Sequence, residues 1–115
     1  IESLMRSADL FVSASLAEGS GYALLEAMAC GLRPVVTDIP SFRAITGDGR
    51  IGRLWPRGDA AALAEALVAA SSDVAASDTS REEVRDHFNA ALSFHALGRR
   101  WAEAYRQVAG GKGAA

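Results

Sequence analysis

The sequence predicts an α/β fold built on a partial, doubly wound parallel sheet. Three observations indicate it: an apolar run at Leu10–Val12, a glycine turn followed by an apolar stretch over residues 21–30, and the pattern of a second strand at Arg33–Thr37. A strand, a helix and a strand in this order form the right-handed unit of a parallel sheet. Because ligands of such sheets bind at the carboxyl ends of the strands, residues 14–20 are the expected position of a binding site.

The first strand follows a short helix over residues 1–8, and its continuous apolar run is typical of a central parallel strand. The helix over residues 21–30 is apolar on nearly every side, and Gly31 is its expected end. Only about three strands are legible, whereas a parallel sheet needs neighbours on both sides. We therefore expect a piece of a larger protein that begins in the middle of a doubly wound domain.

After the second strand, a turn at residues 38–43 leads into a short helix, for which Ser41 is the expected cap. A loop at residues 46–49 and a short third strand at Ile51–Trp55 follow. Asp59 then caps a longer helix, whose inner face is formed by Leu63, Leu67 and several alanines.

The C-terminal third is less apolar. Residues 71–80 are small and polar, as in a linker, and Thr79 with Glu82 has the form of a capping box. Residues 93–95 interrupt the helix that follows and precede a last helix. We therefore divide the chain into a partial α/β domain at 1–70, a linker at 71–80, C-terminal helices at 81–109 and a disordered tail at 110–115. Four aromatic side chains lie on apolar faces and are expected in the core: Trp55, Phe88, Phe94 and Trp101.

The composition excludes several classes of function. The chain has 115 residues, half of them hydrophobic, which suits one modest core. A formal net charge of -2 without a basic stripe argues against a nucleic acid partner. Cys30 is the single cysteine, which excludes a disulfide within the chain. No run reaches transmembrane length and no signal peptide is visible, so we expect a cytoplasmic protein, with the inner face of the membrane as an alternative for the parent protein.

Glu26 is the most informative single residue, because it lies in an otherwise apolar helix. A buried carboxylate is costly unless it is paired, hydrogen-bonded or protonated. Two interpretations stay open: a structural pair with Arg33 or Arg43, or a carboxylate whose partners are the hydroxyls of a bound ligand.

The turn Gly19-Ser20-Gly21 can present free backbone N–H groups to an anion at the start of the helix. A carboxylate stands on each side of this turn, at Glu18 and Glu26. Phosphate on the amides and sugar hydroxyls on the carboxylates would together describe a nucleotide sugar.

Other catalytic sites are not supported. His87 and His95 have no Cys, Asp or Glu at the spacing of metal ligands, so we expect no metal site. Ser20 lies between glycines but lacks the G-x-S-x-G form and a suitable histidine, which argues against a Ser-His-Asp hydrolase.

The stretch from Ala8 to Leu67 resembles the C-terminal domain of retaining glycosyltransferases of the group 1 type, glycosyltransferase family 4. The hallmark of that family is a pair of glutamates separated by seven residues, which here are Glu18 and Glu26. The family pattern E-A-M-A-x-G-x-P-V-V begins at the second glutamate, and residues 52–59 match G-x-L-x-x-x-G-D. Residues 93–105 resemble the closing segment. The resemblance implies the GT-B architecture, in which two Rossmann-like domains face a cleft, and this chain would be the second half of the C-terminal one.

The resemblance also implies a function for each site residue. Glu18 would contact the hydroxyls of the transferred sugar as the catalytic residue, and Glu26 would bind the ribose of the nucleotide. The donor would also contact the backbone amides of four neighbouring residues: Gly19, Ser20, Gly21 and Tyr22. The implied reaction transfers a sugar from a nucleotide sugar to an acceptor hydroxyl, with retention and without a metal.

Two departures from the family pattern matter. Ser20 replaces the usual Phe between the glycines. The basic residues that hold the diphosphate, and the domain that binds most of the acceptor, lie upstream of Ile1 in the family, so we expect the isolated chain to be inactive. Alternatives are a non-catalytic nucleotide-sugar-binding or interaction module, or another GT-B enzyme such as a sugar phosphorylase or epimerase. A truncated sheet also leaves an unpaired edge, so we expect self-association, by exchange of terminal helices.

Overall fold

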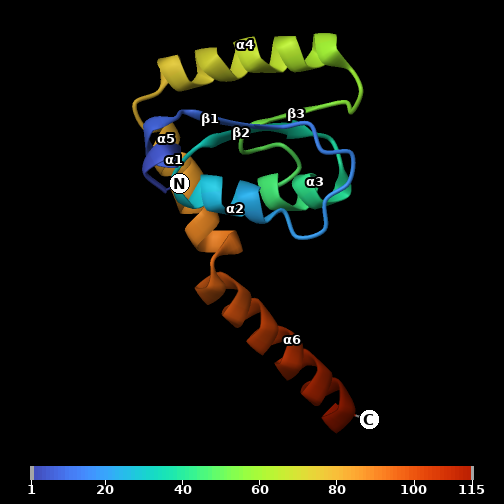
Figure 1. Cartoon of the computed structure of the whole chain (residues 1–115). Coiled ribbons are helices and arrows are strands. Elements are labelled where there is room, and N and C mark those ends of the chain that lie inside the picture. The colour runs from blue at the N-terminus through green and yellow to red at the C-terminus, as the bar shows by residue number, and fades with distance from the viewer. Residues whose placement is uncertain (1, 115) are drawn as a thin grey trace.

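The computed structural model describes residues 2–114, with side-chain surroundings through residue 110 (Figure 1). Within that range one parallel sheet has the strand order β1-β2-β3, formed by Leu10–Ser13, Arg33–Thr37 and Arg53–Trp55. Val12 pairs with Val35, and Val36 pairs with Leu54. The predicted α/β fold with a parallel sheet is therefore confirmed.

Helices cover both faces of the sheet (Figure 1). On one face lie α2 (Tyr22–Ala29), α3 (Pro40–Thr46) and α5 (Ser80–His87), and on the other lies α4 (Ala60–Ala76). A short helix, α1 (Glu2–Ser7), leads into β1.

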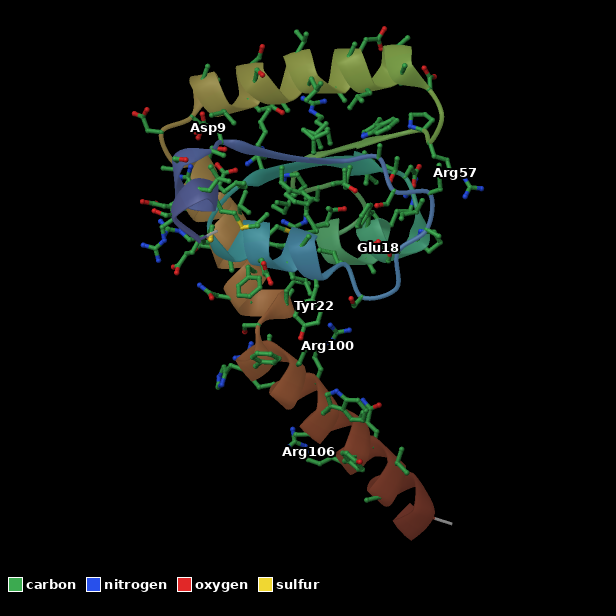
Figure 2. All side chains as sticks on the ribbon, viewed as in Figure 1. Asp9, Glu18, Tyr22, Arg57, Arg100 and Arg106 are labelled. Carbon is green, nitrogen blue, oxygen red and sulfur yellow. The ribbon has the colours of Figure 1, made fainter. Side chains whose placement is uncertain are left out.

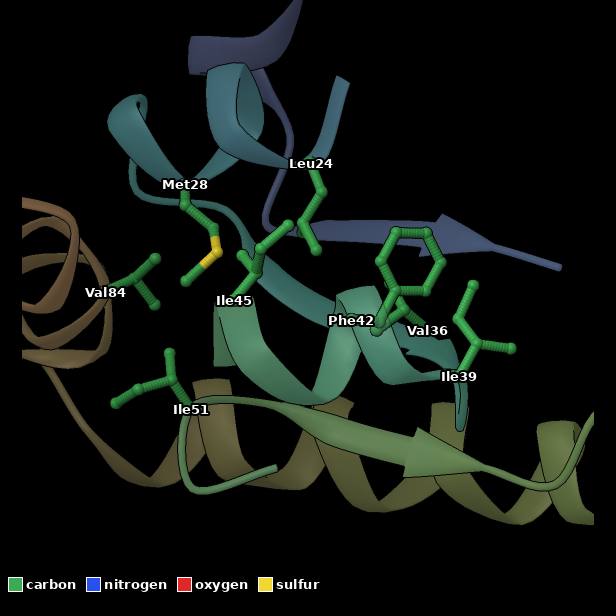
Figure 3. Close-up of a cluster of buried hydrophobic side chains, with 8 residues drawn as sticks. All are labelled: Leu24, Met28, Val36, Ile39, Phe42, Ile45, Ile51 and Val84. Atoms are coloured by element: carbon green, nitrogen blue, oxygen red, sulfur yellow. The ribbon is translucent and has the colours of Figure 1, made fainter. Parts of the chain in front are cut away.

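The middle strand β2 has a core on each side, because successive side chains of a strand point to opposite faces. Val36 belongs to the larger cluster, beside Leu24, Met28 and Phe42 (Figure 3). Val35 belongs to the cluster on the other face, which contains Trp55 and Ala70 and packs against α4. The prediction that Leu63 and Leu67 form the inner face of that helix is confirmed, since both pack on this second cluster.

The C-terminal part leaves the body of the molecule. After α5, a π-helical turn at Phe88–Leu92 is followed by extended backbone at Ser93. The interruption predicted at residues 93–95 is therefore confirmed for Ser93 and wrong for residues 94–95, which are helical. Helix α6 (Phe94–Ala114) then projects away from the sheet (Figure 1), so the longest dimension reaches 54 Å against 30 and 26 Å.

Several sequence-based boundaries need correction. The linker predicted at residues 71–80 is wrong for 71–76, because α4 continues to Ala76, and for Ser80, where α5 begins. Alanine is the best helix former and serine costs little, so a small, polar stretch can extend a helix that is already packed. The disordered tail predicted at 110–115 is wrong for 110–114, whose backbone continues α6, and residue 115 lies outside the described residues. The third strand begins at Arg53 rather than at Ile51.

Two predicted caps are also wrong. Helix α3 begins with Pro40 after Ile39, and the Ser41 hydroxyl is buried within the helix rather than capping it. Thr79 does occupy the N-cap position of α5, but its side chain makes no capping bond. It contacts the Glu83 carboxylate at 3.3 Å instead of forming the box with Glu82. Asp59, by contrast, caps α4 as predicted, accepting a hydrogen bond of 2.9 Å from the Ala62 amide.

Burial differs from the prediction at both ends of the chain. Strand β1 lies at an edge of the sheet instead of its centre, and Val12 is 46% exposed. Trp55 is buried and Phe88 packs on the core, as predicted. The placement of Phe94 and Trp101 in the core is wrong, since these side chains are 86% and 63% exposed.

Candidate functional site

The carboxyl ends of the three strands meet at one end of the sheet, which lies to the right in Figure 1. Residues 14–20 follow β1 there, and they carry Glu18, Gly19 and Ser20, all exposed to solvent. Figure 2 shows Glu18 at this end of the molecule. The structure therefore places the predicted loop where ligands of parallel sheets bind.

Gly21 joins this loop to α2 in a conformation that favours glycine. Its φ of 66° is left-handed, and it is the N-cap of the helix without any side-chain capping bond. A Cβ atom at this position would lie 2.5 Å from Cδ1 of Ile45. Gly21 is therefore buried against α3, and the first-turn amides of α2 are left without a side-chain cap.

Glu26 lies on the solvent side of α2, so the expectation that it is buried is wrong. Tyr22, Ala23 and Ala29 are exposed as well, so α2 has one face in contact with solvent. The structural pair with Arg33 or Arg43 is not formed either. Within residues 2–110, Arg33 lies 3.6 Å from the Glu83 carboxylate, and Arg43 pairs with two aspartates, Asp38 and Asp48.

A groove of about 310 Å³ runs between α2 and the start of α6. Ser20 and Glu26 form its polar part, and Tyr22 borders it while remaining 61% exposed. The other lining residues are apolar: Leu25, Ala29, Phe88, Leu92, Phe94 and Leu97. Three of the six predicted site residues therefore share one groove, whereas Glu18, Gly19 and Gly21 are not among its lining residues.

Three side chains hold the loop that carries Glu18. The Thr37 hydroxyl, at the end of β2, donates to the Ser15 carbonyl at 2.6 Å. The Arg57 guanidinium, just after β3, donates to the Leu16 carbonyl at 3.3 Å. The Ser13 hydroxyl accepts a hydrogen bond from the Ser15 amide at 3.3 Å. The loop is thus tied to all three strands at the edge where they end.

The sequence matches the family described as "Glycosyl transferases group 1" over residues 1–73, more than half of the chain. The chain belongs to this family. The predicted resemblance is confirmed, and Glu18 and Glu26 both lie within the matched residues of this group 1 chain.

Known relatives are similar over part of their length. A phosphatidyl-myo-inositol mannosyltransferase of Mycobacterium leprae is 48% identical over 66 residues, covering 56% of this chain and 18% of the relative. Its counterpart from Mycobacterium tuberculosis strain H37Rv is 39% identical over 95 residues, covering 78% of this chain and 24% of the relative. A GDP-mannose:cellobiosyl-diphosphopolyprenol alpha-mannosyltransferase of Xanthomonas oryzae is 36% identical over 69 residues, covering 60% of this chain and 18% of the relative. The chain thus spans less than a quarter of the length of these relatives.

The fold is also similar to a solved structure. A sucrose-phosphate synthase from Thermosynechococcus elongatus matches with a TM-score of 0.74 at 27% identity, over 94% of this chain and 27% of that one. The group 1 chain therefore has the α/β, Rossmann-like architecture of a GT-B glycosyltransferase domain.

An ion pair lies close in sequence to the carboxyl end of β2. Arg43 of α3 forms a two-point contact with Asp38, which follows β2, with Nη2 and Oδ2 2.8 Å apart. The hydrogen bond from Arg43 lowers the pKa of the Asp38 carboxyl, and the same contact raises the pKa of Arg43. Arg43, one of the two arginines that the sequence offered as a partner for Glu26, is thus paired with Asp38.

Sequence reasoning missed Thr37 and Arg57 as residues near the site. Thr37 is the last residue of β2 and Arg57 lies two positions after β3, and that location was the signal available, since loops at carboxyl ends of strands converge. Their hydrogen-bond partners are main-chain carbonyls, which every residue carries, so the residue types could not identify these contacts.

Neither a metal site nor a single membrane-spanning helix is present within the described residues. They contain no group of three or more His, Cys, Asp or Glu that could hold a metal ion. They also contain no single helix long and apolar enough to cross a membrane, although one bent pair, Ala60–Ala76 with Ser80–Gly110, meets both criteria together.

Proposed function

We propose that this chain forms the donor-binding half of a retaining glycosyltransferase, which transfers a sugar from a nucleotide sugar to an acceptor hydroxyl. The observation that carries the proposal is the arrangement around the start of α2. Two exposed carboxylates, Glu18 in the loop before α2 and Glu26 within α2, bracket in sequence a helix N-terminus that has no side-chain cap. Membership of the group 1 family and the mannosyltransferase names of its relatives support the same conclusion.

Glu26 binds the ribose in this proposal. A carboxylate that accepts hydrogen bonds from a diol makes charge-assisted contacts, which are stronger than neutral ones. Its exposure favours this role, because a ligand can reach it without displacing an arginine. The apolar wall of the neighbouring groove, including Leu25 and Phe88, limits the water around a ligand bound there.

Glu18 faces the transferred sugar and contacts the hydroxyls near the reacting carbon. The amides of Gly19, Ser20, Gly21 and Tyr22 bind the sugar and the diphosphate, where the positive end of the helix dipole favours a negative group by about 0.3–1 kcal/mol. An oxocarbenium-like transition state and a leaving diphosphate both need fixed charges of this kind.

The remaining parts of the reaction belong to the parent protein. We propose that basic groups outside this chain complete the diphosphate site, and that an N-terminal domain binds most of the acceptor, which is a glycan, a lipid or a small molecule. Alone, the chain is then inactive and binds its donor weakly. We further propose that no metal is required and that the reaction takes place in the cytoplasm, at the inner face of the membrane if the acceptor is a lipid.

The names of the relatives make GDP-mannose the first donor to test. The experiment is calorimetric titration of GDP, UDP, ADP and GDP-mannose into the chain and into Glu18→Gln and Glu26→Gln. We expect one base to bind, Glu26→Gln to weaken the nucleotide and the nucleotide sugar equally, and Glu18→Gln to weaken only the nucleotide sugar.

Two outcomes would change the proposal. Saturable binding that neither substitution alters would place the donor elsewhere on the chain. Absence of binding would show that the half-site needs the rest of the enzyme, and the same two variants would then be measured in the parent protein.

A further inference from the structure

The loop that carries Glu18 has little structure of its own. Residues 14–20 connect β1 to α2, and every one except Ser15 is exposed. Such a loop is expected to be mobile unless other groups hold it, because few buried contacts oppose its motion. The hydrogen bonds that fix this loop therefore determine the position of the Glu18 carboxylate.

Thr37 is the strongest of these groups. It is the last residue of the central strand, its side chain is fully buried, and its hydroxyl donates to the Ser15 carbonyl at 2.6 Å. Valine has the branched shape of threonine without the hydroxyl, so the hydroxyl is the group that distinguishes Thr37 from an apolar residue of the same shape. The hydroxyl is what threonine adds, and the Ser15 carbonyl is what it binds.

Arg57 makes a second tether from the outside. It lies in the turn after β3 and donates to the next carbonyl along the loop, that of Leu16, at 3.3 Å. Figure 2 shows Arg57 and Glu18 at the same end of the molecule. Consecutive carbonyls are thus bound from β2 and from the turn after β3, just before the chain reaches Glu18.

We propose that Thr37 is a positioning residue for Glu18, with Arg57 as an exposed second tether. The inference rests on the proposed function, in which Glu18 faces the transferred sugar. The hydroxyl of Thr37 fixes the loop through Ser15 and so sets the distance between the Glu18 carboxylate and the start of α2. Thr37 itself touches no substrate.

The test compares Thr37→Val, which keeps the shape and removes the hydroxyl, with Thr37→Ser, which keeps the hydroxyl. The first readout is the ¹⁵N order parameter of the backbone at residues 15–19. We expect values near those of rigid backbone, about 0.85, in the wild type and in Thr37→Ser, and values below about 0.6 in Thr37→Val, with α2 and β2 unchanged. Arg57→Gln should give a smaller decrease in the same residues.

The second readout is the ratio of the affinities for GDP-mannose and GDP. Because Glu18 contacts only the sugar, Thr37→Val should lower this ratio by about tenfold, the equivalent of one charge-assisted hydrogen bond, while the affinity for GDP stays the same. Thr37→Ser should restore the ratio.

Each result decides something different. Unchanged order parameters in Thr37→Val, or a loss of order spread over the whole sheet, would overturn the proposal whatever the ligand does. A mobile loop with an unchanged affinity ratio would show that the hydrogen bond from Thr37 does not affect sugar binding. That result would also overturn the proposal. If the wild type binds neither ligand, the half-site needs the rest of the enzyme, and the affinity ratio is measured in the parent protein instead. The order parameters of the isolated chain still decide whether Thr37 holds the loop.

Discussion

At Gly21, both the backbone conformation and the packing around the residue require glycine. Its φ is 66°, and a Cβ atom would lie 2.5 Å from a buried isoleucine, Ile45. We expect Gly21→Ala to lower the free energy of unfolding by roughly 2 kcal/mol, from left-handed strain and from displacement of Ile45. Urea unfolding followed by circular dichroism measures the change.

Two other glycines separate these causes. Gly58 has a φ of 81° with open space around it, and Gly19 has open space without a positive φ. We expect Gly58→Ala to cost about 1–2 kcal/mol from strain alone, and Gly19→Ala to stay within about 0.5 kcal/mol of the wild type. Equal stability of all three variants would show that neither strain nor the contact with Ile45 matters.

Arg53 and Asp73 form an exposed ion pair between β3 and α4, with Nε and Oδ2 3.0 Å apart. The hydrogen bond from Arg53 lowers the pKa of Asp73 in the folded state. A lowered folded pKa stabilises the fold above the unfolded value, and this contribution is lost as the pH falls through the folded value. Arg53→Gln should therefore cost a few tenths to about 1 kcal/mol at pH 7, and this cost should be lost at an acid pH at which Asp73 is protonated in the folded state.

A double-mutant cycle with Asp73→Asn, measured by urea unfolding at both pH values, tests this prediction. The coupling energy should be present near neutral pH and vanish in acid. A coupling that persists in acid would mean that the contact is held by packing rather than by charge.

Sequence reasoning identified the two glutamates but not the surroundings of Glu26. Helix α2 contains so many apolar residues that it is expected to be buried all round. Ala23 and Ala29 explain the difference, because alanine counts as apolar in a pattern yet tolerates water at little cost. The pattern therefore could not show which side of the helix faces solvent.

At the scale of elements, the start of α4 is predictable from the local sequence. Asp59 was expected to cap it and does, accepting a hydrogen bond from the Ala62 amide. Asp59→Ala should lower the free energy of unfolding by about 1 kcal/mol, whereas Asp59→Asn, which keeps an acceptor, should cost less. Thermal unfolding of both variants measures the difference, and equal losses would assign the effect to charge rather than to the cap.

The C-terminal end of the same helix could not be predicted from local rules. Residues 71–76 are small and polar, and their helical state depends on tertiary contacts, including the pairing of Asp73 with Arg53 and the burial of Ala70. The strands were easier, because β-branched and apolar runs in a parallel sheet are buried on both faces. Arg33–Thr37, the central strand, has the boundaries that its sequence predicts.

At the scale of the whole molecule, the order of elements was predictable but the partners of the outer surfaces were not. An apolar stripe at helical spacing predicts that a helix buries one face, and it does not say against what. Helix α6 carries such a stripe, and four of its side chains are largely exposed: Phe94, Trp101, Tyr105 and Val108. The edge of β1 is open in the same way, with Val12 exposed.

These surfaces lead to the expectation that the chain self-associates. Aromatic side chains bring about 150–250 Å² each, and the largest apolar patch on a typical monomer is about 300–600 Å². Phe94, Trp101 and Tyr105 are 86%, 63% and 66% exposed, so this stripe alone reaches the size at which apolar surfaces mark contacts. We expect sedimentation velocity to show a mass above 12.0 kDa that increases from micromolar to millimolar concentrations.

Two substitutions decide which surface is responsible. Trp101→Glu places a charge in the α6 stripe, and Val12→Lys places one on the sheet edge, where lysine discourages strand pairing. Because the stripe exposes the larger apolar area, we expect Trp101→Glu to restore the monomer mass and Val12→Lys to have little effect, with Gln107→Glu on another side of α6 as the control. The reverse pattern would assign association to the open edge of β1, and a constant monomer mass in the wild type would contradict self-association altogether.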